Sequence, residues 1–134
     1  MLPEKIHLEI VTPRRRVVDK DVDEVVLPGQ EGSFGVLPGH AGLLAGLAPG
    51  VARARTATDE VVMAISSGFA EVSSDRVIVL AETCEKAQEI DERRAREKVE
   101  ELERQVSQGQ AESDPEAIRF RIMKHMARIR AHEG

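Results

Sequence analysis

The stretch LPGQEGSFGVLPGHAGLLAGLAPG, from Leu27 to Gly50, decides the fold of this chain. It contains three Pro-Gly pairs, and each is a turn signal because proline presets φ while glycine permits positive φ. Between the turns lie apolar residues that a flexible Gly/Ser-rich linker lacks: Phe34, Val36, Leu37, Leu43, Leu44 and Leu47. The stretch therefore predicts short strands that fold back repeatedly, with rigid loops projecting from a β scaffold.

The flanking sequence continues this pattern as far as Glu82. Ile6, Leu8 and Ile10 alternate with polar residues, as in a strand that is buried on one face. Further apolar runs recur at intervals of roughly ten residues, bounded by turn signals. The sequence predicts an N-terminal β-sandwich, a flattened barrel of about 8–10 strands, over residues 1–84.

After Cys84 the composition changes to strong helix formers. No Gly or Pro occurs from Glu85 to Val106, which predicts a first helix over this range. A second helix is expected to begin with Ser113 or Asp114 as its cap and Pro115 in its first turn, and to run to about Arg130. The fold class is therefore α+β, with a C-terminal antiparallel two-helix hairpin over residues 85–134.

The apolar stripes of the two predicted helices are narrow. They consist of Ala87, Ile90, Ala95, Val99, Leu102 and Val106 in the first helix and Ile118, Ile122, Met126 and Ile129 in the second. Glu89–Arg93 and Glu92–Arg96 are expected as ion pairs four residues apart. A narrow seam holds two helices together but buries little surface elsewhere. Two arrangements stay open, a hairpin folded against the sandwich and a hairpin that docks, undocks and opens.

Composition limits the function classes. The net charge of −5 argues against nucleic acid as a main partner, because phosphate neutralisation needs a basic surface. No apolar run approaches the roughly 20 residues of a membrane span, so we expect a soluble cytoplasmic protein that meets a membrane only through a complex. Cys84 is the single cysteine, and it is expected to be a structural thiol rather than a nucleophile.

No catalytic residue set is evident, so the chain is expected not to be an enzyme. The glycines do not form a phosphate-binding loop, and His125 and His132 lie two helical turns apart, too far for a shared metal without other ligands. Asp91 and Arg94 lie three apart on a helix face, as in an ordinary surface ion pair. The last helix has a basic face that is either solvated or a surface for an acidic protein partner: Arg119, Arg121, Lys124, Arg128 and Arg130.

One motif connects the chain to a known family. The run GSFGVLPGHA from Gly32 to Ala41, followed by Leu43-Leu44 and closed by Pro49-Gly50, resembles the signature of the epsilon subunits of bacterial F-type ATP synthases. The resemblance extends from Ile6 to about Arg130. It implies a non-catalytic subunit of the central stalk that links the gamma subunit to the c-ring of a proton-translocating synthase. It also implies a peripheral location on the cytoplasmic face of the bacterial inner membrane.

The resemblance also implies where the partners bind. The c-ring would contact the loop that contains Gly29, Gln30, Glu31, Gly32 and Ser33. The gamma subunit would contact Pro38, Gly39 and His40, although a histidine bonded within its own loop is the alternative for His40. In this family the extended C-terminal helices meet acidic surfaces of the alpha and beta catalytic subunits and inhibit ATP hydrolysis.

A second motif of the family is present at the start of the predicted hairpin. The run from Ile90 to Ala95, IDERRA, matches the I/L-D-x-x-R-A motif that binds ATP in some bacterial epsilon subunits. The resemblance implies a nucleotide site made of Ile90, Asp91, Arg94, Ala95, Lys124 and Arg128, with ATP as a regulatory ligand and no required cofactor. An arginine is more usual at the position of Lys124, and lysine gives up bidentate contact with phosphate.

Without the resemblance, the residues allow a different class of protein. The main alternative is a β-sandwich module with a helical tail that binds a small molecule or serves as a scaffold. A nucleotide-dependent enzyme is a weaker alternative because no base, nucleophile or metal cluster is evident. In each case we expect a fragment that ends near Glu82 to fold by itself, because the dense apolar strands precede that residue.

Overall fold

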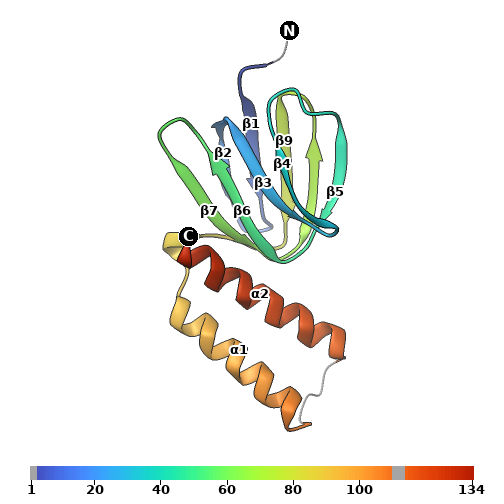
Figure 1. The fold of residues 1–134 in the computed structure, drawn as a ribbon, viewed down its shortest axis with the longest axis vertical. Coiled ribbons are helices and arrows are strands. Elements are labelled where there is room, and N and C mark those ends of the chain that lie inside the picture. The colour runs from blue at the N-terminus through green and yellow to red at the C-terminus, as the bar shows by residue number, and fades with distance from the viewer. Residues whose placement is uncertain (1–2, 110–113) are drawn as a thin grey trace.

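The computed structural model describes residues 3–109 and 114–134, and its polypeptide forms ten strands followed by helices (Figure 1). The predicted fold class is confirmed. The strands are β1 Ile6–Val11, β2 Arg16–Val22, β3 Glu24–Gly29, β4 Gly32–Val36, β5 Leu43–Leu47, β6 Gly50–Arg55, β7 Glu60–Ile65, β8 Gly68–Val72, β9 Arg76–Ala81 and β10 Cys84–Lys86. The helices are the single 3-10 turn η1 Ala87–Glu89, α1 Glu92–Ser107 and α2 Pro115–Glu133.

The strands form two layers of a sandwich. One layer has the order β10-β7-β6-β3-β4 and the other β5-β8-β9-β1-β2, and they are joined where Gly29 of β3 pairs with Leu47 of β5. Neighbouring strands are antiparallel except β1 and β9, which are parallel. The core between the layers is aliphatic, and its largest fully buried side chains include Ile6, Leu8, Ile10, Leu27, Met63 and Ile65.

Gly68 shows why a glycine is needed where β8 approaches β9. Its φ is +153°, a conformation that other residues rarely adopt, and a Cβ atom there would lie 2.0 Å from the carbonyl oxygen of Leu80. The backbone of β8 therefore comes close to β9 at the Gly68–Ala81 pair.

The hairpin begins later than its composition predicts, so the prediction of helix from Glu85 is wrong for the first seven residues. Glu85 and Lys86 instead pair with Ala64 and Met63 of β7, and α1 begins at Glu92. Pairing with an open strand edge outweighs the weak intrinsic helix propensity of a few residues. The predicted Glu89–Arg93 pair is also wrong, because Glu89 precedes α1 and binds Arg15 at 2.6 Å. Whether a domain boundary falls after residue 84 stays a prediction.

The hairpin lies against the sandwich, with α2 between α1 and the strands (Figure 1). This is the simpler of the two arrangements that the sequence leaves open. Ala127 and Ala131 of α2 are buried with Ala64, next to Val51 and Val62 of the sheet. Small residues at such a contact allow close approach but bury little apolar surface. None of the described helices is long and apolar enough to cross a membrane.

The predicted seam between the helices is largely confirmed. Ala95, Val99 and Ile129 form its centre, with Ile122 and Met126 at its border. Val106, predicted to belong to the stripe, is 54% exposed because it lies in the last turn of α1. Pairs of Arg96 with Glu133 (2.8 Å) and Glu92 with His132 (3.3 Å) join the start of α1 to the end of α2, as an antiparallel hairpin requires.

A fragment that ends at Lys86 should fold cooperatively without the hairpin. The main core cluster consists only of residues between Ile6 and Cys84, whereas the hairpin residues belong to two smaller clusters. We expect a single sigmoidal thermal transition. The NMR contacts between protons of paired strands should be those of the intact chain. A second fragment ending at Glu82 removes β10 and the buried Cys84, and it should melt at a lower temperature. A broad, noncooperative melt of the 1–86 fragment would contradict the expectation.

Candidate functional site

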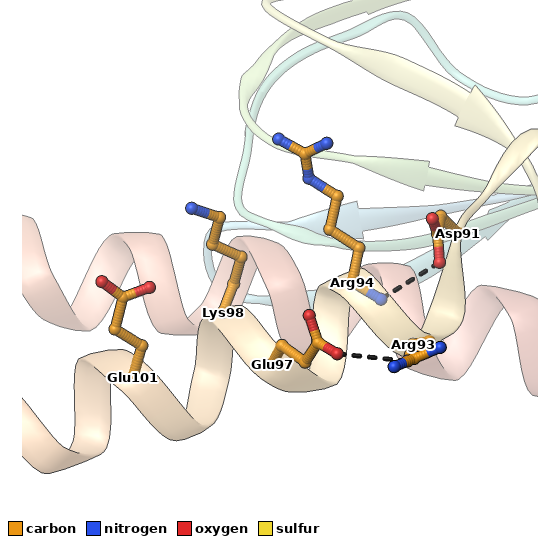
Figure 2. A pocket seen from close by; sticks show the side chains of 6 residues that line it. All are labelled: Asp91, Arg93, Arg94, Glu97, Lys98 and Glu101. Carbon is orange, nitrogen blue, oxygen red and sulfur yellow. Dashed lines mark hydrogen bonds and ion pairs between the residues drawn. The ribbon is translucent and has the colours of Figure 1, made fainter.

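Asp91 is the N-cap residue of α1, and this local role positions the IDERRA motif. Its Oδ1 accepts a hydrogen bond from the backbone N–H of Arg94 at 3.1 Å, which satisfies a donor at the helix start. Figure 2 shows this bond among the side chains that line a shallow depression. The volume of the depression is about 470 Å³. The depression is lined by Asp91, Arg93, Arg94, Glu97, Lys98 and Glu101.

The basic side chains that line this depression differ in whether they form ion pairs. Arg93 binds Glu97 at 3.2 Å, whereas Arg94 and Lys98 form no ion pair among the described residues (Figure 2). Both extend from α1 toward the same side, as expected for residues four apart. Arg94 and Lys98 are therefore available for an anionic ligand.

Lys124 and Arg128, the other basic residues of the predicted nucleotide site, line a second depression of about 480 Å³. It lies between the β1–β2 turn, the connection from β9 to β10, and α2. Its lining residues include Arg14, Arg15, Glu82, Glu85, His125 and Arg128. The structure thus divides the predicted nucleotide residues between two neighbouring parts of the surface.

Arg128 connects α2 to the edge strand β10. Its Nε lies 2.8 Å from Oε1 of Glu85, and its Nη2 donates a hydrogen bond to Oε2 of Glu85 at 3.3 Å. The side chain is only 14% exposed, so this pair is screened less by solvent than the other ion pairs of the surface. Glu85 was not predicted as a site residue, because the helix-forming residues around it predicted a helix where the structure has strand β10. An anionic ligand would have to compete with Glu85 for Arg128.

His125 lies beside Arg128 and is held in its neutral form. The pKa of His125 is lowered to about 4: burial is the largest cause, and the positive charges of Arg128, Lys124, Lys98 and Arg121 act in the same direction. Its neutral Nδ1 lies 3.3 Å from Nη1 of Arg128 and is placed to accept a hydrogen bond. Lys98 lines the first depression, whereas Lys124 and Arg128 line the second. The pKa of His125 is therefore lowered by positive charges from both depressions.

Two other residues of the predicted nucleotide site are part of the core. Ile90 is buried with Ala64, Ala127 and Ala131, and Ala95 is buried in the seam between the helices. Their side chains support the position of the motif, so contact with a ligand in this conformation would come from their backbone groups. The nucleotide site itself stays a prediction.

The residues predicted to meet the gamma subunit lie in the β4–β5 connection. The N–H of Gly39 donates to the carbonyl oxygen of Ser74 at 2.7 Å, which ties this loop to the β8–β9 turn. Nδ1 of His40 lies 2.6 Å from the carbonyl oxygen of Ala41, so His40 bonds within its own loop. That local bond is the alternative left open by the sequence, and contact with a partner stays a prediction.

The residues predicted to meet the c-ring form the β3–β4 hairpin turn. Gly29 pairs with Gly32, so Gln30 and Glu31 are the two residues of the turn, and Ser33 follows on β4. Gln30 donates its N–H to the carbonyl oxygen of Gly46 at 2.9 Å, which fixes the turn against β5. Gln30 and Glu31 are exposed at the end of the sandwich, and their contact with a ring stays a prediction.

The β5-β8-β9-β1 layer has an exposed apolar face that was not predicted from the sequence. Phe69 of β8 is paired with Leu80 of β9, which is paired with Val11 of β1. Phe69 is 61% exposed, Leu80 is 58% exposed, and Leu44 of β5 is 72% exposed. We call Leu44, Phe69, Leu80 and Val11 the open face. The alternation within each strand was visible in the sequence, but the register that aligns these strands was not.

Cys84 is a buried free thiol, as the sequence analysis expects of a structural cysteine. Burial is the main cause that raises its pKa to about 12, so the thiol stays protonated near neutral pH. A protonated buried thiol is a poor nucleophile. Its role in the described structure is to fill the core at the start of β10.

Comparison with known proteins identifies the same β-sandwich that the strands form. Residues 5–87 match the family described as "ATP synthase, Delta/Epsilon chain, beta-sandwich domain". The ATP synthase epsilon chain of Syntrophobacter fumaroxidans is 40% identical over 132 residues, which is 98% of each chain. The ATP synthase epsilon chain of Nitratidesulfovibrio vulgaris is 40% identical over 131 residues, 96% of each chain.

A solved structure shows the same fold over nearly the whole chain. A chain of the Euglena gracilis mitochondrial ATP synthase, in a structure of its OSCP/F1/c-ring, superposes with a TM-score of 0.79 at 24% identity. The superposition covers 99% of this chain and 82% of the Euglena chain. With the full-length relatives and the matched sandwich domain, the predicted resemblance is confirmed: the chain belongs to the ATP synthase delta/epsilon chain family.

Proposed function

We propose that this chain acts as a non-catalytic central-stalk subunit of a proton-translocating F-type ATP synthase, peripheral on the cytoplasmic face of the bacterial inner membrane. In this role it links the gamma subunit to the c-ring and restrains ATP hydrolysis through its hairpin. Family membership supports the assignment to the synthase, and the relatives over nearly the full chain are named epsilon chains.

The observation that carries the proposed partner contact is the open face. α2 covers part of the β6–β7 surface, whereas Leu44, Phe69 and Leu80 on the other layer remain exposed. Contiguous exposed apolar side chains of this size mark interaction sites in soluble proteins. We assign this face, together with the loop at Pro38 to His40, to the gamma subunit. The turn at Gln30 and Glu31 is assigned to the c-ring.

Co-purification tests the proposed function. The tagged chain, co-expressed with the gamma subunit of the same organism, should elute with gamma as a stable complex in size-exclusion chromatography. The alternative, a β-sandwich module that binds a small molecule or scaffolds another assembly, predicts that the two proteins elute separately. Separate elution with both proteins folded would overturn the proposed function.

We further assign ATP as a regulatory ligand of the two depressions. Arg94 and Lys98 are available in the first depression, and Lys124 and Arg128 line the second. The positive charges of Lys98, Lys124 and Arg128 all act on His125. Guanidinium groups bind phosphate through paired, charge-assisted hydrogen bonds. A polyphosphate between the depressions would draw α1, α2 and β10 together and favour the docked hairpin.

Arg94→Ala should weaken ATP binding at least tenfold. A hydrogen bond to a charged group contributes about 1.5–3 kcal/mol, and about 1.4 kcal/mol corresponds to a factor of ten in affinity. Isothermal titration calorimetry with ATP measures the change. Arg104→Ala is the matched control, because Arg104 lies on α1 but lines neither depression. Equal affinity for ATP in the two variants would exclude Arg94 from the site.

A further inference from the structure

His7 is held between two carboxylates on the outer face of β1 and β2. Its Nδ1 lies 2.8 Å from Oδ1 of Asp21, and its Nε2 lies 2.6 Å from Oδ1 of Asp19. Asp21 is the register partner of His7, and Asp19 is two residues away on the same face of β2. The imidazole ring therefore bridges two successive outward positions of the neighbouring strand.

This geometry requires a proton on each ring nitrogen. An ionised carboxylate only accepts hydrogen bonds, and a neutral imidazole has a single N–H donor. In the neutral form one ring nitrogen would direct its lone pair at a carboxylate, and that contact would be repulsive. The hydrogen bonds to Asp21 and then Asp19 accordingly raise the pKa of His7 above its ordinary value of 6.5.

The bridge is part of a longer charged network. Arg16 lies 3.2 Å from Glu9 and 3.3 Å from Asp19, so acidic and basic side chains alternate in the order Glu9, Arg16, Asp19, His7 and Asp21. Lys5 and Asp23 form a further pair next to it. On the opposite side, Arg76 of β9 is the register partner of His7. The imidazole of His7 is the side chain in this network whose ordinary pKa of 6.5 lies close to neutral pH.

Side-chain contacts contribute strongly to the attachment of β2, because β2 is an edge strand. It lies at the end of its layer, and β1 is its single partner in the strand order of the described residues. An edge strand has a ladder of backbone hydrogen bonds on one side only, so cross-strand side-chain pairs contribute a larger share of its attachment. Loss of one carboxylate contact at His7 would act directly on the β1–β2 pair.

We propose that His7, Asp19 and Asp21 form a proton-dependent clamp that fastens the edge strand β2 to β1. The clamp is closed when the imidazole is protonated, and one of its carboxylate contacts is lost when the proton leaves. Because the folded-state pKa is raised, the contribution of the clamp is fully present below pH 6.5 and is lost as pH rises through the folded-state pKa of His7. This inference is independent of the proposed function.

NMR titration of the full chain tests the clamp. The ring protons of His7 should report a pKa above 6.5, and the Asp19→Asn, Asp21→Asn double variant should move that pKa downward. Amide hydrogen exchange, corrected for its intrinsic pH dependence, should show protection of β2 falling as His7 deprotonates, while protection of β8 stays constant. In His7→Gln, the protection of β2 should no longer depend on pH over this range.

His132→Gln is the matched control. His132 lies 3.3 Å from Glu92 in the hairpin, so its replacement should leave the pH dependence of β2 intact. A His7 pKa at or below 6.5 would overturn the clamp, as would the same pH dependence of β2 protection in His7→Gln and in the unaltered chain. The titration of the unaltered chain remains decisive even if a variant fails to fold.

Discussion

Replacing Phe69 and Leu80 together with threonine is expected to weaken gamma binding by about 30-fold or more. Truncating one anchor residue at the centre of an interface costs about 2 kcal/mol or more, which corresponds to about 30-fold in Kd, and the expected loss counts one such anchor between the two residues. Both side chains are more than half exposed, and threonine has high β-propensity. The free energy of unfolding of the isolated chain should therefore change by only about 0.5 kcal/mol per site.

Binding to immobilised gamma, measured by biolayer interferometry, gives the change in Kd. Phe120→Thr is the matched control, because Phe120 is an exposed phenylalanine on α2 rather than on the open face. It should bind gamma as the unaltered chain does. Unchanged affinity of the Phe69/Leu80 variant, together with weakened affinity of a His40→Ala variant, would move the interface from the open face to the β4–β5 loop.

Ending the chain at Lys86 is expected to raise ATP hydrolysis by the reconstituted synthase by about fivefold or more, with assembly and ATP synthesis largely intact. Coupling free energies between sites are typically about 1–3 kcal/mol, which sets this scale. The main core and the open face both lie before Lys86, so the partner contacts of the sandwich should survive. Hydrolysis and synthesis rates in proteoliposomes measure the two effects.

The expected inhibition requires the hairpin to leave the sandwich. Opened, the 16 residues of α1 and the 19 residues of α2 would reach about 24 Å and about 28 Å. Arg119, Arg121 and Arg130 are exposed and form no ion pair among the described residues, so they are available for an acidic surface of the catalytic subunits. Replacing these three with glutamine should reproduce part of the truncation, as should high salt.

A variant that undocks the hairpin without removing it should have the opposite effect. Ala127→Glu places a carboxylate in the buried contact with Ala64, so the docked state should be destabilised and hydrolysis should fall. If truncation leaves hydrolysis unchanged under every nucleotide condition, the regulatory role fails and a structural role replaces it. If Ala127→Glu raises hydrolysis as truncation does, the docked hairpin is the inhibitory state.

Local chemistry in the sequence was sufficient for the architecture and the family. The Pro38-Gly39 turn and the alternation of Ile6, Leu8 and Ile10 indicated short strands that fold back, because turn conformation and strand amphipathicity are properties of adjacent residues. The turn predicted at Pro28-Gly29 is wrong, because both residues pair with β4 at the end of β3. Pro115 and the absence of Gly and Pro from Glu85 to Val106 indicated two helices for the same reason. The GSFGVLPGHA run then identified the family without any knowledge of contacts.

Only the tertiary structure decided which surfaces are covered, which are open and which distant residues meet. Periodicity shows that Phe69 and Leu80 point outward, but strand register is needed to align them with Val11. Glu85 belongs to a strand because β7 offers an unpaired edge, and only there does it meet Arg128. His7 likewise meets Asp19 and Asp21 through β1–β2 pairing. These contacts form between residues that are far apart in the sequence. The free energy of such pairing cannot be read from a short stretch of neighbouring residues.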